Sequence, residues 1–401
     1  MIYRKKVAII GGGASGLVAA ICAARQGISV ELFEKSAKVG RKILATGNGR
    51  CNISNEHISV ENYHGKDLSF IKEILKRFST QDAKKFFSGI GLEIVEGTNG
   101  RLYPMSLQSS SVVELLLYEC KRLGVSINLS CEVIKIIKEN SLFRVFTESL
   151  SKTYDNVIIA TGSLAMPSLG SSESGYKFAR AFGLEIEKPF ASLVQLVCSD
   201  KFVLDASGVK IDAYIEVFVD REVKNSARGD LLFTNYGLSG SAILDISRSV
   251  SEAIVKKCEV LLKIDLMPNL SLNELKSLLQ KRAKNLPLEL WLSGIINKKL
   301  IKLIANVSKV SLKNQIDTKV IHKLSFAIKN LTVKVENTKG TKSCEVMAGG
   351  VSTKDINSKT MQSKQVEGLF FCGEVLDVDG DCGGYNLHFA WASGYLAGKS
   401  L

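Results

Sequence analysis

The sequence predicts an α/β fold whose first and last segments form one domain. Near the N-terminus, two apolar strands flank a glycine-rich turn and a helix, which is the order of a βαβ unit. Near the C-terminus, another apolar strand leads into a glycine-rich loop and a last helix. Between these parts, from about residue 189, apolar and polar residues alternate, which favours antiparallel strands. We therefore expect an α/β domain interrupted by an insertion.

The composition is that of a folded, soluble protein. A length of 401 residues exceeds one ordinary core and predicts two or three domains. No apolar run reaches the roughly 18 residues that span a bilayer, so we expect no membrane contact. The nine cysteines include no CxxC pair and no zinc-ligand spacing, which indicates a reducing cytoplasm and no metal site.

The first βαβ unit carries a dinucleotide-binding fingerprint. A strand at 7–10 leads into the glycines, a helix follows at 17–26, and a strand at 28–33 ends on Glu34. The glycines are Gly11, Gly13 and Gly16. They allow a tight turn, approach of the backbone to a pyrophosphate, and packing of helix on strand. The helix N-terminus favours phosphate, and Glu34 can accept a hydrogen bond from a ribose hydroxyl. We therefore predict a Rossmann-like domain.

Further segments are typical of a cofactor site. Residues 38–52 combine glycines, cations and amides with little apolar matter, as expected where backbone approaches a flat or charged ligand; a long surface loop is the alternative. The strand at 154–162 ends in Thr-Gly, and the strand at 368–374 ends in Gly-Glu. The polar loop 377–387 precedes a helix at 388–396, whose N-terminus can stabilise negative charge.

Hydrophobic periodicity and turn residues predict the remaining elements. Helices are expected at 68–90, at 109–123, from 241 onward and across 272–323. Strands are expected at 125–129, 131–137, 193–197, 209–219, 231–234 and 331–335, with turns at Ser207-Gly208 and Arg228-Gly229. The resulting domains are the first part of the nucleotide-binding domain at 1–188, a β subdomain at 189–266, a basic helical subdomain at 267–323, the return strand of the β subdomain at 324–344, and the C-terminal part of the nucleotide-binding domain at 345–401.

Positive charge is concentrated in one part of the chain. The formal net charge is +13, and residues 276–334 alone hold thirteen Lys or Arg against two acidic residues. Such a block is expected of a protein that binds a polyanion; the alternative is a set of solubilising lysines on solvated helices. The candidates for nucleic-acid contact are Lys281, Arg282, Lys284, Lys298, Lys299 and Lys302.

The layout of these motifs resembles the BaiN/RdsA-like flavoproteins, a bacterial family of FAD-dependent oxidoreductases. The specific matches are Gly40-Arg41-Lys42 with residues 46–52, and Gly373-Glu374 with residues 383–386. Two positions differ from the family pattern. Asn235 stands where the family usually has His in an FTHxGLSG motif, so we assign no proton transfer there. His388 stands where Gln is common.

The resemblance implies FAD as cofactor and NAD(P)H as electron donor. It implies either reduction of uridine to dihydrouridine in large-subunit (23S) ribosomal RNA or a reaction on a small molecule such as an enone or amine; a flavin-carrying module without activity is a third reading. The basic block favours RNA. For the proton donor the candidates are Cys382 and Cys51, although either cysteine can instead merely pack on the flavin. The implied cofactor-binding residues are Gly11, Gly13, Ala14, Ser15, Gly16, Glu34, Lys35, Gly40, Arg41, Lys42, Thr46, Gly49, Arg50, Cys51, Asn52, Val133, Thr161, Gly162, Gly373, Glu374, Gly383, Gly384, Tyr385, Asn386 and Leu387.

Overall fold

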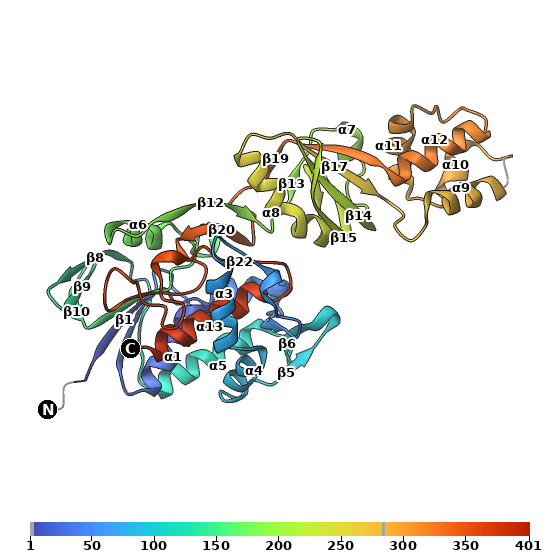
Figure 1. Ribbon diagram of the computed structural model, residues 1–401. Coiled ribbons are helices and arrows are strands. Elements are labelled where there is room, and N and C mark those ends of the chain that lie inside the picture. Colours follow the sequence, from blue (N-terminus) through green and yellow to red (C-terminus); the bar gives the residue numbers. More distant parts are fainter. Residues whose placement is uncertain (1–3, 283–284) are drawn as a thin grey trace. The chain divides into compact units, whose positions relative to one another are not determined.

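The computed structural model describes residues 4–282 and 285–401 (Figure 1). The chain divides into two compact units. Unit 1 combines the residues up to Pro189 with Val346–Leu401, and unit 2 comprises Phe190–Glu345. Each unit has its own hydrophobic core. Within the described ranges, no helix is both long and apolar enough to cross a membrane.

A five-stranded parallel sheet forms the centre of unit 1, which confirms the predicted α/β class. Its order is β21-β11-β1-β2-β7, and every neighbouring pair is parallel. The strands are β1 (Lys6–Ile10), β2 (Ser29–Phe33), β7 (Ser126–Asn128), β11 (Asn156–Ile159) and β21 (Leu369–Phe371). The run Val7-Ala8-Ile9 is fully buried, as expected of a strand covered on both faces.

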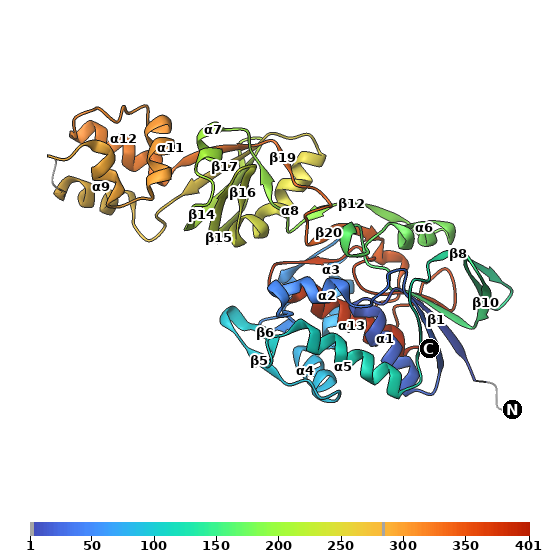
Figure 2. The ribbon, with the colours of Figure 1, turned by 180° about the vertical axis from the view of Figure 1, so that it is seen from behind.

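Helices from both ends of the chain pack together beside this sheet. Figures 1 and 2 show α1 (Ala14–Arg25) next to α13 (Tyr385–Lys399) and α5 (Ser109–Arg122). A Cβ built on Gly394 would lie 2.3 Å from the Ser15 carbonyl oxygen, and one on Gly398 would lie 2.4 Å from that of Ala19. Only glycine permits so close a helix contact, which joins the first and last segments of the chain.

The remaining elements of unit 1 extend and partly correct the expectations. Residues 68–90 form two helices and not one, because the backbone of Phe78 is extended. The side chain of Ser79 then accepts a hydrogen bond from Asp82 N and caps the second helix. The segment 38–52 contains a short helix, and residues 131–137 belong to a three-stranded antiparallel sheet of which we expected only the first strand. The helices are α2 (Arg41–Ala45), α3 (Leu68–Arg77), α4 (Thr80–Ser88) and α6 (Ser174–Ala181). The strands are β3 (Ser54–Asn55), β4 (Tyr63–His64), β5 (Ile94–Glu96), β6 (Arg101–Pro104), β8 (Val133–Glu139), β9 (Leu142–Thr147), β10 (Ser151–Tyr154) and β22 (Asp379–Gly380).

Unit 2 is built on a seven-stranded antiparallel sheet of order β18-β17-β14-β15-β16-β13-β19. The strands are β13 (Leu196–Val197), β14 (Lys210–Val219), β15 (Glu222–Thr234), β16 (Gly237–Ser239), β17 (Val260–Asp265), β18 (Leu331–Val335) and β19 (Asn337–Thr338). The helices are α7 (Lys201–Asp205), α8 (Ser241–Val255), α9 (Leu272–Lys281), α10 (Leu288–Ser293), α11 (Lys298–Ser308) and α12 (Thr318–Lys329). The chain leaves unit 1 along β12 (Ile186–Ser192) and returns along β20 (Val346–Val351).

One predicted turn in unit 2 is wrong. Arg228 and Gly229 lie inside β15, where Arg228 pairs with Tyr214 of β14. The hairpin instead reverses at Asp220-Arg221, two residues with positive φ. A Cβ on Gly229 would lie 2.7 Å from the Ser241 hydroxyl oxygen at the start of α8. The glycine therefore serves the approach of a helix to the strand, a use that a turn signal in the sequence does not reveal.

Candidate cofactor site

Four neighbouring strands of the parallel sheet deliver predicted site residues to one edge. Gly11 follows β1, Glu34 follows β2, Thr161 comes two residues after β11, and Gly373 comes two residues after β21. The carboxyl ends of parallel strands share one edge, and open α/β sheets bind their ligands there. The fold thus brings motifs from both ends of the sequence to a single place in unit 1.

The three glycines of the first turn have different surroundings. Gly11 has a φ of 111°, and a Cβ there would lie 2.4 Å from the Ala160 carbonyl oxygen. A Cβ on Gly16 would lie 2.0 Å from the Gly11 carbonyl oxygen, so this glycine closes the helix onto the turn. A Cβ on Gly13 would meet no atom within 4 Å. Gly13 is therefore the position of the three that is open to a ligand.

The helix α1 begins on a glycine and has no side-chain cap among the described residues. Its N-cap residue, Gly13, provides no side-chain cap, and the first turn contains no acidic residue. α13 begins in the same way, with Gly384 at the N-cap and no acid in its first turn. The first-turn N–H groups and the positive end of each helix dipole favour an anionic group at both places.

Glu34 is fixed in orientation by the backbone around it. Its carboxylate accepts hydrogen bonds from Gly12 N at 2.9 Å and from Ser36 N at 2.7 Å. Lys35 beside it is half-buried, and Val133 is buried at the start of β8. A carboxylate held in this way still has lone pairs for a ribose hydroxyl, the use we expected of it.

The segment from Gly40 to Asn52 contacts the rest of unit 1 through its cations. Lys42 Nζ lies 2.7 Å from Glu374 Oε2, an ion pair that joins the N-terminal and C-terminal motifs. Arg41 donates to the Ser168 carbonyl at 2.7 Å. The guanidinium of Arg50 lies 5.0 Å from the centre of the Tyr103 ring. Thr46 donates to the Ile43 carbonyl, and Gly49 is exposed with open space at its Cβ position.

Asn52 of this segment has a buried polar atom without a hydrogen-bond partner among the described residues. Its side-chain oxygen is buried and accepts no hydrogen bond from the described residues. An unsatisfied buried acceptor costs about 1–3 kcal/mol, so such groups normally find a partner. The open position at Gly13, the two uncapped helices and the unpaired Asn52 oxygen together fit a large anionic cofactor with hydrogen-bond donors, as FAD is.

The C-terminal loop is held by its own hydrogen bonds. The Asn386 amide accepts from Gly380 N and donates to the Gly380 and Asp381 carbonyls, so this side chain braces the loop. Tyr385 is buried edge-on against Tyr63, with ring centres 6.0 Å apart. Tyr385, Asn386 and the half-buried Leu387 belong to the first turn of α13. This helix begins three residues earlier than expected.

The two candidate cysteines differ in exposure. Cys51 is fully buried, and burial raises the pKa of its thiol to about 12. Cys382 is half-buried in the loop before α13. A thiol without exposed surface offers no atom to a substrate in this structure, so Cys382 is the better placed of the two.

Two residues that the sequence did not mark as functional stabilise the site. His388 is fully buried; its Nδ1 lies 2.9 Å from Ser54 Oγ and its Nε2 lies 3.1 Å from the Phe78 carbonyl oxygen. A carbonyl can only accept, so Nε2 carries the proton and Nδ1 accepts from Ser54. Asn55 donates to the Gly383 carbonyl at 3.0 Å. Asn55 belongs to no recognised motif, and His388 was noted only as a departure from the family pattern, so the sequence did not reveal these contacts.

The nucleic-acid candidates fall into distinct groups in unit 2. Lys281, Lys298 and Lys302 are exposed. Lys299 donates to the Ser207 carbonyl at 2.6 Å, and Arg282 donates to the Trp291 carbonyl at 2.9 Å. Lys284 lies outside the described residues. Asn235 is exposed in the turn between β15 and β16.

The fold and the site define a Rossmann-type α/β protein built to hold a dinucleotide cofactor. Comparison with known proteins agrees, because the family profile "HI0933-like protein Rossmann domain" matches residues 5–400. The chain belongs to this family.

Two curated relatives have the same identity to this chain. The 3-dehydro-bile acid delta(4,6)-reductase of Clostridium scindens is 36% identical over 98% of both chains. The ribosomal RNA dihydrouridine synthase of Haemophilus influenzae is 36% identical over 98% of this chain and 97% of its own. The Escherichia coli protein of the same name is 32% identical over 98% and 97%. These matches confirm the BaiN/RdsA-like resemblance.

Solved structures support the same fold. A 3-ketosteroid delta1-dehydrogenase from Sterolibacterium denitrificans aligns over 98% of both chains with a TM-score of 0.54 and 12% identity. A 3-ketosteroid-delta4-(5alpha)-dehydrogenase from Rhodococcus jostii RHA1 aligns over 99% of this chain and 97% of its own, with a TM-score of 0.52 and 15% identity. At such identities the likeness concerns the fold. With the family matches, it makes the chain an FAD-dependent oxidoreductase.

Proposed function

We propose that this enzyme reduces uridine to dihydrouridine in large-subunit ribosomal RNA, with NAD(P)H as electron donor. Two relatives, each matched over 98% of this chain, are named ribosomal RNA dihydrouridine synthase. The observation that carries the proposal is the charge of the helices α9–α12 and the loops between them.

Most lysines of this region make no ion pair, and Lys329, which pairs with Asp265, is an exception. Among the described residues, the following make no ion pair: Lys276, Lys281, Lys298, Lys299, Lys302, Lys309, Lys313, Lys319 and Lys323. Of the three acids in these helices and loops, Glu274 belongs to the capping box of α9 and Asp317 is the N-cap of α12. A surface of unpaired lysines gains affinity from every phosphate it contacts, which a small neutral substrate cannot provide. This charge therefore favours a nucleic-acid substrate.

The residues of unit 1 would hold the cofactor and supply the proton that the substrate receives. When bound, FAD supplies the redox chemistry, and the protein supplies position and charge. The open Gly13 and the N-terminus of α1 would hold its phosphates, Glu34 its ribose, and Asn52 a donor group of the cofactor. Lys42 is kept in place by Glu374. We assign to Cys382 the donation of a proton to a carbon atom of the substrate.

The second candidate is a flavin-dependent reductase or oxidase of a small molecule, with an enone or an amine as substrate. The bile acid reductase of Clostridium scindens has the same 36% identity to this chain as the Haemophilus influenzae synthase. Overall identity therefore does not separate the two functions, and the choice depends on the basic surface.

Nucleoside mass spectrometry separates the two functions. Ribosomal RNA from a strain that lacks this protein should have lost one dihydrouridine, and the intact gene should restore it. RNA with unchanged dihydrouridine content would contradict the proposal. In parallel, the purified FAD-loaded enzyme should oxidise NADPH or NADH with RNA from the deletion strain and not with a steroid enone; the reverse preference would establish the second candidate.

A further inference from the structure

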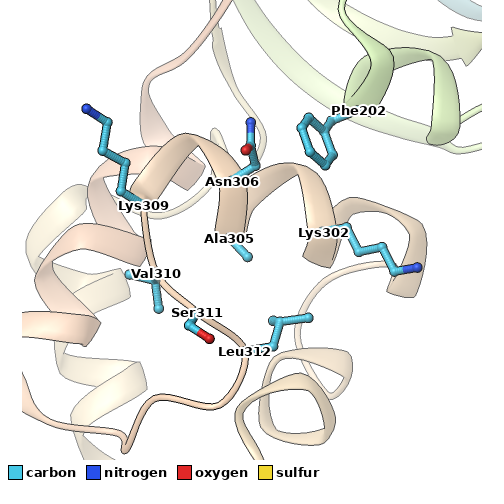
Figure 3. Close-up of a pocket in the computed structure, with 8 residues that line it drawn as sticks. All are labelled: Phe202, Lys302, Ala305, Asn306, Lys309, Val310, Ser311 and Leu312. Carbon is cyan, nitrogen blue, oxygen red and sulfur yellow. The ribbon is translucent and has the colours of Figure 1, made fainter.

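The structure has a hollow in unit 2 that belongs to no part of the cofactor site. It lies between α7, α11 and the segment that follows α11, and has a volume of about 490 Å³ (Figure 3). Four side chains define its chemistry: Phe202, Lys302, Asn306 and Lys309. No acidic residue lines it.

The arrangement of these side chains combines an aromatic ring with two cations. Figure 3 shows Phe202 reaching from α7 toward Asn306, while Lys302 and Lys309 point outward in different directions at the rim. Lys302 and Asn306 are four residues apart on α11, so helical geometry places them on one side of the helix. Lys309 is the C-cap residue that follows the helix, with a φ of 52°. Both lysines are exposed, and neither makes an ion pair within the described ranges. Apolar side chains, among them Val310 and Leu312, line the same hollow.

We propose that this hollow binds one unstacked nucleotide of a single-stranded RNA segment. The Phe202 ring would stack on the base, the Asn306 amide would hydrogen-bond to its edge, and Lys302 and Lys309 would contact the phosphates on either side. Single-stranded RNA is recognised in this way, by bases stacked on aromatic rings and cations along the backbone. The two lysines at the rim favour an anionic ligand, and the Phe202 ring with the apolar lining favours one that carries an aromatic ring. The inference rests on the proposed RNA function and identifies where the protein would bind its substrate.

Binding of a fluorescein-labelled oligouridylate of about 12 nucleotides to the FAD-loaded full-length protein tests the proposal. Phe202→Leu keeps an apolar side chain in the packing and should raise the dissociation constant about tenfold without changing its salt dependence. Lys302→Gln/Lys309→Gln should lower the slope of log affinity against log salt by about 0.7 for each lysine. Thermal melting identifies any variant that is misfolded.

A matched control is Lys319→Gln/Lys323→Gln, which removes the same charge from α12. If this control weakens binding as much as Lys302→Gln/Lys309→Gln does, and Phe202→Leu binds like wild type, binding is a diffuse charge effect and the hollow is refuted. The proposed function is judged separately, by the dihydrouridine that the wild-type gene restores. Full restoration by wild type together with normal RNA binding by both hollow variants would overturn this inference and leave the proposed function standing.

Discussion

The buried His388 should make unit 1 sensitive to mild acid. The ring has no exposed surface, and burial lowers the pKa of His388 from 6.5 to about 4, although the nearby Asp82 carboxylate and the Phe78 carbonyl favour the charged form. Protonation would add a proton to Nδ1, which accepts from Ser54 in the neutral tautomer. The change we consider is His388→Gln, because a glutamine amide can also donate to Phe78 and accept from Ser54 without titrating.

The size of the effect follows from the two pKa values. Between them the unfolded chain binds a proton that the folded chain does not, so the free energy of unfolding falls as pH decreases through this window. The stability linked to His388 is fully present above about pH 6.5 and is lost progressively toward about pH 4. Each pKa unit corresponds to about 1.4 kcal/mol, which gives a loss of about 2.5 kcal/mol between about pH 7.5 and about pH 4.5.

Urea unfolding followed by tryptophan fluorescence measures this loss. The chain has two tryptophans, and Trp391, which donates to the Ile53 carbonyl, lies in unit 1. In a Trp291→Phe background, the remaining tryptophan reports on unit 1 alone. His388→Gln should flatten the pH dependence by about 2.5 kcal/mol relative to the parent. His57→Gln, which removes an exposed histidine of the same unit, is the control and should leave the profile unchanged. Parallel profiles for the parent and His388→Gln would refute the reasoning.

Four further substitutions test the cofactor site. Gly13→Ala should abolish FAD retention in gel filtration and leave the melting temperature of the cofactor-free protein unchanged, because its Cβ meets no protein atom within 4 Å. Gly16→Ala should instead destabilise the fold by about 1–3 kcal/mol, because its Cβ would lie 2.0 Å from a carbonyl oxygen. Equal effects of the two substitutions would count against the assignment. Lys42→Met should weaken FAD binding in a fluorescence titration while costing at most about 1 kcal/mol of stability, since its pair with Glu374 is partly exposed; unaltered binding would remove Lys42 from the site. Cys382→Ala should lower turnover with FAD fully bound, as measured by NAD(P)H oxidation with substrate, and unchanged turnover would exclude its thiol as the proton donor.

The sequence predicted the α/β class because the signals involved are local. A strand, a glycine-rich turn and a helix in succession leave few alternatives, and the apolar run at 7–10 matches β1. One error arose because a local signal was missed, and another because a tertiary contact decides the structure. The break between α3 and α4 depends on a capping box at Ser79, and Gly229 resembles a turn residue although it makes room for α8.

The candidate cofactor site was predicted in part because its motifs are also local. The prediction was incomplete because contacts between distant segments decide the burial and bonding of some residues. Glycines such as Gly13 and Gly373 stand in motifs whose meaning is set by the elements beside them. Cys51 stands in a glycine-rich, polar segment and was a candidate proton donor, yet its thiol is fully buried. Burial of this kind depends on how distant segments fold over the residue. The role of Asn386 as a brace of its own loop depends on hydrogen bonds that residue type alone does not specify.

The close contact between α1 and α13 has a consequence for biosynthesis. The residues of unit 2 are continuous in the sequence, whereas unit 1 combines the beginning of the chain with its end. On the ribosome, unit 2 can complete its core while α13 is still unmade, because domains fold as their residues emerge. The first βαβ unit must then wait, with the face that receives Gly394 and Gly398 uncovered, until translation has delivered the last helix. Because the site combines motifs from both segments of unit 1, we expect capture of the cofactor only after α13 has been synthesised.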